Sequence, residues 1–343
     1  MNVKLFFRFV LVYLLVSLAI TALVRDVGDD LLVEAVTSTL KFGWIFLRYA
    51  IWIVPLLLVM PMVMGWRNFV ARLGMIGMAA SGAVLLQVAF SFLKTAIPMI
   101  VPFYADPPLA DLDRWLHGGI DPWVLTMDWA TWLPMNAILP FYIIVWSFPA
   151  IALPVVIAIS DRDTQRTARF LVLYVACWLV LGNILAMVGS SVGPVFYDAL
   201  IGGGRFADLR AALERVGIGD TGIGMTQAYL WQGYSTGSLA LGSGISAFPS
   251  VHLGIATVTA LYMGERSRWL ILPGLLFVAV ILFLSVYSGY HYAVDGYFSI
   301  VFMLGVWVAA RRVQGSEGRW RALVPRLGRS AAPRIPQPHV SRG

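Results

Sequence analysis

Two of the four histidines in this chain lie in segments whose residue types suit acid–base or nucleophilic chemistry. His252 closes the segment SAFPSVH, and His291 lies in the segment VYSGYHYAVDG, four residues before Asp295. Residues four apart share one face of a helix, so the Asp295 carboxylate can accept a hydrogen bond from one imidazole nitrogen and leave the other lone pair free. His117 and His339 stand in a loop and in a basic tail, where a solvated or interfacial histidine is the simpler interpretation.

The elements that must position these residues are membrane helices. The chain has 343 residues, of which 59% are hydrophobic and only 13% are charged. A soluble domain carries about 25% charged residues, so this chain has more apolar surface than one aqueous fold can bury. The sequence therefore predicts an all-α integral membrane protein. The composition excludes a disordered chain, a coiled coil and a nucleic-acid-binding module, and the single cysteine, Cys177, excludes a disulfide framework.

Eight segments are apolar enough to cross a bilayer, which takes roughly 20 residues. They lie at about residues 5–24, 44–64, 72–93, 137–159, 169–189, 249–264, 269–288 and 292–310, and the sixth is short. No small-residue cleavage site follows the first segment, which predicts a retained helix and not a signal peptide. The segment 106–123 has apolar residues at helical spacing and is expected to be a helix in the membrane interface.

Lysine and arginine residues gather in the loops on one side of this predicted bundle. They are Lys4, Arg8, Arg67, Arg72, Arg162, Arg166, Arg169, Arg266, Arg268 and eight arginines in the tail 311–343. By the positive-inside rule this side is cytoplasmic, with both termini inside the cell. The alanine, glycine and arginine usage favours a bacterial inner membrane with the histidine segments on the periplasmic face, and a luminal site in a eukaryotic membrane stays open.

In this topology His252 lies at the outer mouth of the sixth span and His291 at the outer mouth of the eighth. The chain crosses the membrane and returns between them, so the two imidazoles can face each other at one bilayer depth. An ionisable residue within a span is by default a candidate for function. The alternative is a buried His291–Asp295 pair that ties two helices together without any chemistry.

These residues also carry a family resemblance. Pro249–His252 resembles the proline-serine-x-histidine motif of the type-2 phosphatidic acid phosphatase superfamily. Val286–Asp295 is similar to that superfamily's last motif, in which three residues separate a histidine from an aspartate. The resemblance implies a six-helix phosphatase or phosphotransferase core. On this basis the expected domains are an added helix pair at 1–65, the core at 66–310 with outer interfacial segments 94–136 and 190–248, and the basic cytoplasmic tail 311–343.

The same resemblance implies roles for individual residues. His291 would attack phosphorus, Asp295 would fix its tautomer, and His252 would protonate the departing alcohol and deprotonate the incoming one. Ser250 and the backbone N–H groups at the start of the sixth span would hold the phosphoryl oxygens, because a helix N-terminus binds anions. Pro249 suits the first turn of that helix. No cofactor is expected, and no metal, because the chain has no HExxH or similar spacing.

Two departures from the family pattern concern the cations that hold phosphate. Ser285 stands where the phosphatases carry an arginine, six residues before the last histidine. The superfamily's first motif, a lysine followed after six residues by arginine-proline, is also missing in full form. In its place, either the segment 190–198 contributes, with Gly193 where the motif has arginine, or Lys94 supplies a charge at the outer rim. Helix order favours 190–198, and a lysine that extends to the lipid headgroups is the alternative interpretation of Lys94.

A site with few cations suits a singly charged phosphodiester better than a doubly charged monoester. In this respect the chain resembles the inositol phosphorylceramide synthase and sphingomyelin synthase branch. We therefore expect a lipid phosphotransferase that takes a headgroup from a phospholipid donor and delivers it to a lipid alcohol such as ceramide or diacylglycerol. The alternatives are a phosphatase that uses water on phosphatidate or an isoprenyl (di)phosphate, a transporter with a His–Asp relay, and a structural membrane protein. Nucleic acid is not an expected partner.

Overall fold

The computed structural model describes residues 1–25, 30–238 and 242–323. The described part is helical throughout and contains no strand. The predicted basic tail begins inside the last helix, α16 (Ala293–Leu323), and the rest of that tail, residues 324–343 with His339, lies outside the described residues.

Six stretches in the described ranges are long and apolar enough to span a membrane. They are α1 (Val3–Val24), α4 (Trp66–Ile100), the continuous run of α7 (Met135–Ile138), η1 (Phe141–Val145) and α8 (Trp146–Ser160), the run of α9 (Thr164–Val175), η2 (Ala176–Leu185) and α10 (Ala186–Val188), the run of η4 (Arg268–Leu270) and α15 (Ile271–Tyr287), and the part Ala293–Gly315 of α16. The predicted class, an all-α multi-pass membrane protein, is confirmed.

The predicted count of eight spans is not confirmed, and the second predicted span is wrong as one continuous helix. In its place α2 (Asp30–Ala50) and α3 (Val54–Met64) meet at an angle of 64°. Pro55 lies in the first turn of α3, where the missing N–H and the proline ring prevent α2 from continuing. The sixth predicted span is α14 (Val251–Arg266), whose 16 residues reach only about 24 Å.

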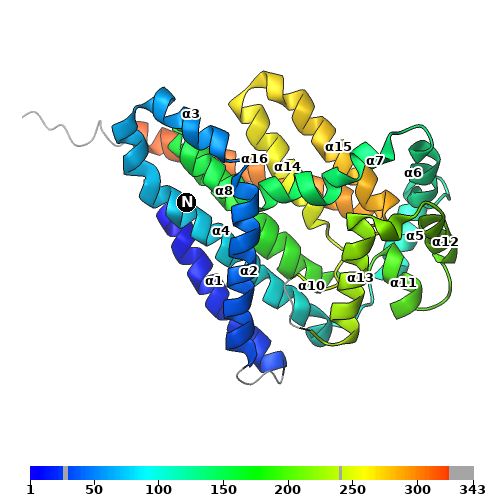
Figure 1. Ribbon diagram of the computed structural model, residues 1–343. Helices are drawn as coiled ribbons and strands as arrows, with labels where there is room; N and C mark the ends of the chain where they lie inside the picture. The colour runs from blue at the N-terminus through cyan, green and yellow to red at the C-terminus, as the bar shows by residue number, and fades with distance from the viewer. Residues whose placement is uncertain (26–29, 239–241, 324–343) are drawn as a thin grey trace, which may run out of the picture.

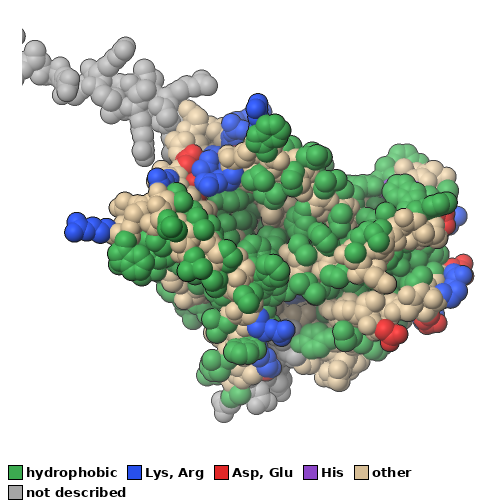
Figure 2. Space-filling model, turned by 45° about the horizontal axis from the view of Figure 1, so that its top comes forward, with side chains coloured by type: hydrophobic (Ala, Val, Ile, Leu, Met, Phe, Trp, Pro, Cys, Tyr) green, Lys and Arg blue, Asp and Glu red, His purple; other side chains and the backbone are tan. Residues whose placement is uncertain are grey.

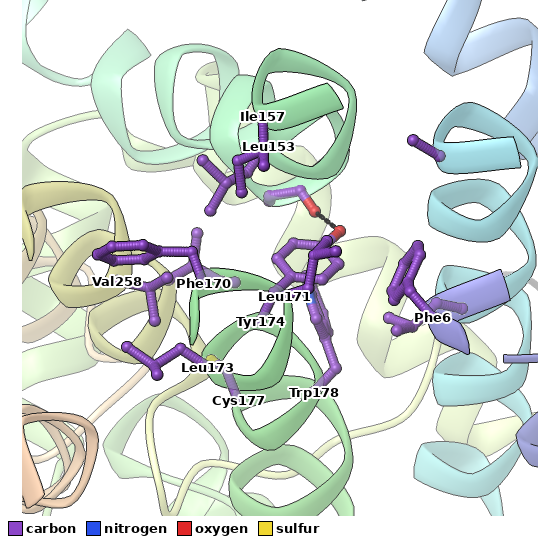
Figure 3. Close-up of a cluster of buried hydrophobic side chains, with 14 of the residues drawn as sticks. Phe6, Leu153, Ile157, Phe170, Leu171, Leu173, Tyr174, Cys177, Trp178 and Val258 are labelled. Atoms are coloured by element: carbon purple, nitrogen blue, oxygen red, sulfur yellow. Dashed lines mark hydrogen bonds between the residues drawn. The ribbon is translucent and has the colours of Figure 1, made fainter. Parts of the chain in front are cut away.

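The centre of the bundle is a cluster of buried apolar side chains from α1, α4, α8, α9, η2, α14 and α16 (Figure 3). Phe6 of α1 is fully buried in it, and Gly82 of α4 lets the two helices approach, because a Cβ there would come within 2.7 Å of the Phe6 ring. The Tyr13 hydroxyl donates a hydrogen bond to Asn183 of η2. The first helix is therefore packed into the same core as α14, which carries His252, and α16, which follows His291.

The outer face of the bundle is apolar. In Figure 2 hydrophobic side chains cover most of the central surface, and charged side chains lie mainly toward its margins. Leu15, Leu272 and Val301 are among the exposed large side chains of the spans, each with more than half of its surface accessible. Such a belt suits contact with lipid and not with water.

Short helices gather at one end of the bundle, on the right of Figure 1, opposite to α3. They are α5 (Asp106–Leu116), α6 (Pro122–Ala130), α11 (Pro194–Leu200), α12 (Ala207–Arg215), η3 (Ile218–Asp220) and α13 (Gly222–Ser235). The predicted interfacial helix at 106–123 is thus two helices, α5 and α6, separated by Gly118 and Gly119, which both have positive φ. The loop between α15 and α16 contacts these short helices, because the N–H of Val195 in α11 donates to the Gly289 carbonyl oxygen at 2.8 Å.

Candidate active site

A cavity of about 160 Å³ lies among α4, η1, α8, η2 and the start of α14. Both histidines of the sequence motifs line it, together with Lys94 and Pro249. Six aromatic side chains form much of the rest of its wall: Phe90, Tyr142, Trp146, Trp178, Phe196 and Tyr290. The cavity therefore combines a small group of ionisable side chains with an apolar, mostly aromatic wall, as ligand sites commonly do.

His252 stands in the first turn of α14, which begins because Ser250 caps it. The Ser250 hydroxyl accepts the N–H of Leu253 at 3.4 Å, a normal N-cap contact. The imidazole of His252 lies between two rings, with its centroid 4.4 Å from that of Tyr142 and 4.0 Å from that of Trp146. The Trp146 indole N–H also donates to the His252 carbonyl oxygen at 3.0 Å. These contacts fix the imidazole ring at the amino-terminal end of α14.

His291 lies in the loop between α15 and α16 and is 6% exposed. Its backbone N–H donates to the Ser285 carbonyl oxygen at 3.2 Å, and its Nδ1 lies 3.3 Å from Oδ2 of Asp295. The same carboxylate oxygen accepts the N–H of Tyr292 at 3.1 Å. Because α16 begins only at Ala293, the His291–Asp295 contact is made at a helix start and not within a continuous helix.

The two imidazoles face each other across the cavity. Their ring centroids are 5.8 Å apart, and the planes are steeply inclined at 63°. Burial lowers the pKa of His291 to about 3, and the positive charge of Lys94 acts in the same direction. His291 is therefore a neutral base near neutral pH.

Lys94 projects from α4 into the same cavity. Its Nζ lies 5.7 Å from the centroid of the Phe90 ring, and in the described part of the chain no carboxylate lies within ion-pair distance of it. A partly buried ammonium group without a counter-ion is an anion-binding feature. The structure therefore brings Lys94 to the histidines.

Three of the predicted phosphate-binding residues do not line the cavity. The N–H of Gly193 donates to Asp106 at 2.9 Å, and the Ser285 hydroxyl donates to the Leu282 carbonyl oxygen at 2.9 Å. Ser250 is fully buried as the helix cap described above. These residues shape the two histidine loops, and the parts of the segment 190–198 that line the cavity are Val192 and Phe196.

Sequence reasoning missed the aromatic wall and two buried aspartates. Tyr142 and Trp146 are four residues apart, which places them on one helix face, but such pairs are common in membrane spans. Asp106 and Asp113 were expected in an interfacial helix on the outer side and are buried, with 0% and 3% exposed. Nothing in their spacing distinguished them from the exposed Asp111 between them.

Gly193 gives a first testable prediction. Its φ is +84°, and a Cβ there would lie 2.5 Å from the Tyr290 carbonyl oxygen, beside His291. Gly193→Ala combines left-handed strain of roughly 1–2 kcal/mol with a backbone clash, so we expect a lower thermal midpoint in detergent and a large loss of activity. Gly202→Ala is the matched control, because Gly202 has φ +92° and no atom within 4 Å of a Cβ. Equal midpoints for the two variants would contradict this account.

Among the residues that the structure describes, no group of three or more His, Cys, Asp or Glu side chains is arranged to hold a metal ion.

Comparison with curated proteins and with solved structures gave no match. A family model described as the PAP2 superfamily matches residues 107–309, which begin after Lys94 and include both histidine segments. Because the match covers more than half of the chain, this protein belongs to the PAP2 superfamily, whose members are generally phosphatases or phosphotransferases that act on phosphoesters.

Proposed function

We propose that this protein transfers a phosphate-bearing headgroup between lipid alcohols through a phosphohistidine on His291. The observation that carries the proposal is the cavity in which His252, His291 and Lys94 meet, with the two imidazole centroids 5.8 Å apart. One imidazole is held by a carboxylate and the other by two aromatic rings. Such an asymmetric pair suits a division into a nucleophile and an acid–base group.

In the first half-reaction, Nε2 of neutral His291 attacks phosphorus and forms a P–N bond. The bond from phosphorus to the alkoxy oxygen of the donor lipid breaks, and protonated His252 gives its proton to that oxygen, so that the lipid alcohol leaves. Asp295 accepts the Nδ1–H of His291 and stabilises the positive charge that develops on the ring. Lys94 and the N-terminus of α14 stabilise the phosphoryl oxygens.

In the second half-reaction, neutral His252 takes the proton of the acceptor hydroxyl. The acceptor oxygen bonds to phosphorus, the P–N bond breaks, and His291 returns to its neutral form. The cycle leaves both histidines in their starting states, with no net proton uptake. Water in place of the lipid alcohol converts the same cycle into hydrolysis.

The cations of the cavity support transfer of a diester headgroup. Lys94 is the one lysine among the described residues that line it, and no arginine is among them. Once His252 has given up its proton, a single ammonium group with a helix N-terminus balances one negative charge better than two. The resemblance of the motif HYAVD to the inositol phosphorylceramide synthase and sphingomyelin synthase branch agrees with this choice, with ceramide or diacylglycerol as the acceptor.

We also propose the orientation of the chain in the membrane. The histidine loops lie at the end of the bundle opposite to the ion pairs Arg166–Asp161 and Arg169–Glu265. The positive-inside rule supports a cytoplasmic location for those arginines, so the cavity faces the periplasm if the membrane is a bacterial inner membrane.

The start of the family match at residue 107 supports residues 1–65 as an addition to the motif-bearing core.

The proposed function is tested with purified protein and a panel of labelled lipid phosphodiesters and phosphomonoesters, with and without ceramide or diacylglycerol. We expect the label of a diester headgroup to move to the added lipid alcohol. Release of inorganic phosphate from monoesters alone would make the protein a lipid phosphatase and would contradict the argument from the cations.

Lys94 gives a second prediction. Lys94→Met keeps the length of the side chain and removes its charge, so we expect kcat/KM to fall about 10- to 100-fold, the effect of losing one charge-assisted contact to phosphate. Lys94→Arg should retain more activity than Lys94→Met. Lys41→Met is the matched control, because Lys41 is half-exposed and its carboxylate partner is Glu34, outside the cavity. Unchanged kinetics of Lys94→Met would place this lysine outside the phosphate site.

A further inference from the structure

The helix α5 turns two acidic side chains inward. Asp106 and Asp113 are seven residues apart, so they lie two turns apart on one face, and both are buried. Leu112 and Trp115 on other faces of the helix are exposed, with 42% and 74% of their surface accessible. Burying a carboxylate is unfavourable unless hydrogen bonds compensate it, so the partners of these two groups show what their burial achieves.

Asp106 holds two separate segments of the site. Its Oδ2 accepts the N–H of Val192 at 2.8 Å, and its Oδ1 accepts the N–H of Gly193 at 2.9 Å and the hydroxyl of Tyr292 at 2.9 Å. Tyr292 is the residue after His291. One carboxylate therefore joins the loop at 190–193 to the loop that carries the proposed nucleophile.

The loop at 190–193 in turn holds the segment that leads to His252. The N–H of Ala247 donates to the Ser191 carbonyl oxygen at 3.0 Å, and the N–H of Phe248 donates to the Ser191 hydroxyl at 2.9 Å. Ala247 and Phe248 directly precede Pro249, which lines the cavity. Asp106 is therefore connected by hydrogen bonds to both histidine segments. The connection to the His291 segment is direct, through Tyr292, and the connection to the His252 segment runs through the loop at 190–193.

Asp113 holds the start of α16. Its Oδ2 accepts the N–H of Ala293 at 3.1 Å, and its Oδ1 accepts the N–H of Val294 at 3.0 Å. First-turn N–H groups have no partner within their own helix, so Asp113 caps α16 from a distant segment. The next residue, Asp295, orients His291. Burial raises the pKa of Asp113 to about 6, although the hydrogen bonds from the two N–H groups lower it in part. The Asp113 carboxyl is therefore mostly ionised at neutral pH.

We propose that Asp106 and Asp113 are positioning residues that set the geometry of the His252–His291 pair from outside the membrane bundle. This inference rests on the proposed function. Neither carboxylate lines the cavity, so both act through the segments that position the histidines. We call the two residues the carboxylate clamp. The carboxylate clamp makes five hydrogen bonds to the protein and does not contact the substrate. Removal of either carboxylate is therefore expected to slow turnover more than it weakens substrate binding.

The test compares Asp106→Asn, Asp113→Asn and Tyr292→Phe with the matched control Asp111→Asn. Asparagine keeps the size but turns one acceptor oxygen into a donor that faces an N–H group. We expect kcat to fall about 10- to 100-fold for the two clamp variants, with KM changed less than about twofold. Tyr292→Phe removes one of the three donors to Asp106 and should have a smaller effect of the same kind. Asp111 has a side chain that is 74% exposed, and its substitution should leave the kinetics unchanged.

A double-mutant cycle separates positioning from a general loss of structure. If Asp113 acts through Asp295 and His291, Asp113→Asn should cost less than about twofold in an Asp295→Asn background, because the geometry it maintains is already lost. An equal loss of kcat in both backgrounds, or unchanged kcat in the single variants, would overturn the inference. If a clamp variant fails to fold, as judged by its elution and thermal midpoint in detergent, Tyr292→Phe carries the test. Wild-type turnover by His291→Ala would instead reject the proposed function itself.

Discussion

His291→Ala is expected to reduce headgroup transfer by at least about 10³-fold, the scale at which removal of a nucleophile acts in other enzymes. The cause is the loss of the only nitrogen that can form the P–N bond in the proposed cycle. His291 lines the cavity, lies 3.3 Å from Asp295 and is held by a backbone hydrogen bond to Ser285. The measurement is the initial rate of transfer of a labelled headgroup in detergent or in vesicles.

Two controls define this prediction. His291→Asn tests whether a polar side chain of similar size keeps the fold without supplying a nucleophile, and its rate should fall as far as that of His291→Ala. His339→Ala, in the tail, is the matched histidine control and should keep the wild-type rate. A His291→Ala protein that keeps a rate within about tenfold of wild type would remove the covalent mechanism.

His252→Ala is expected to lower the rate about 10²- to 10⁴-fold through loss of the general acid and base. The size of the loss should depend on the leaving group. With a natural lipid donor the departing alkoxide needs the proton of His252, whereas a p-nitrophenoxide leaves without it. The variant should therefore release p-nitrophenol from a p-nitrophenyl phosphodiester in a first turnover and then stop, because His252 is also needed to deprotonate the acceptor.

This pattern distinguishes His252 from a residue that only supports the fold. The His252 ring stacks on Tyr142 and Trp146, so alanine also leaves a gap in the cavity wall. His252→Phe fills that gap without restoring a proton donor and should show the same single turnover. Equal losses on the activated and the natural donor would assign His252 a structural role.

The sequence was informative where physical constraints are local. Long apolar segments must be helices in a bilayer, because each backbone polar group needs a partner there. This predicted α1 and α15 with small errors at their ends, and the start of α16, which continues to Leu323 beyond the predicted end at 310. The return of the chain between the two motifs predicted that His252 and His291 would face each other. The four-residue spacing predicted the contact of His291 with Asp295, even though α16 starts after His291.

The sequence was uninformative where long-range contacts decide the outcome. Hydropathy cannot detect the break between α2 and α3, because apolar residues continue on both sides of it. An aspartate is exposed in most proteins, so the burial of Asp106 and Asp113 became visible only with the N–H groups that they accept from segments about 90 and 180 residues away. Lys94 was ambiguous for the same reason, since only the fold shows that it lies beside the histidines.

The most direct test of the central claim is to identify the phosphorylated residue. The protein is mixed with a labelled p-nitrophenyl phosphodiester in the His252→Ala background, quenched at alkaline pH to preserve the P–N bond, digested and analysed by mass spectrometry. We predict one modified peptide that carries the intact phosphoryl headgroup on His291 and is absent when His291 is also replaced by alanine. Turnover without any modified histidine, or with the label on another residue, would contradict the account.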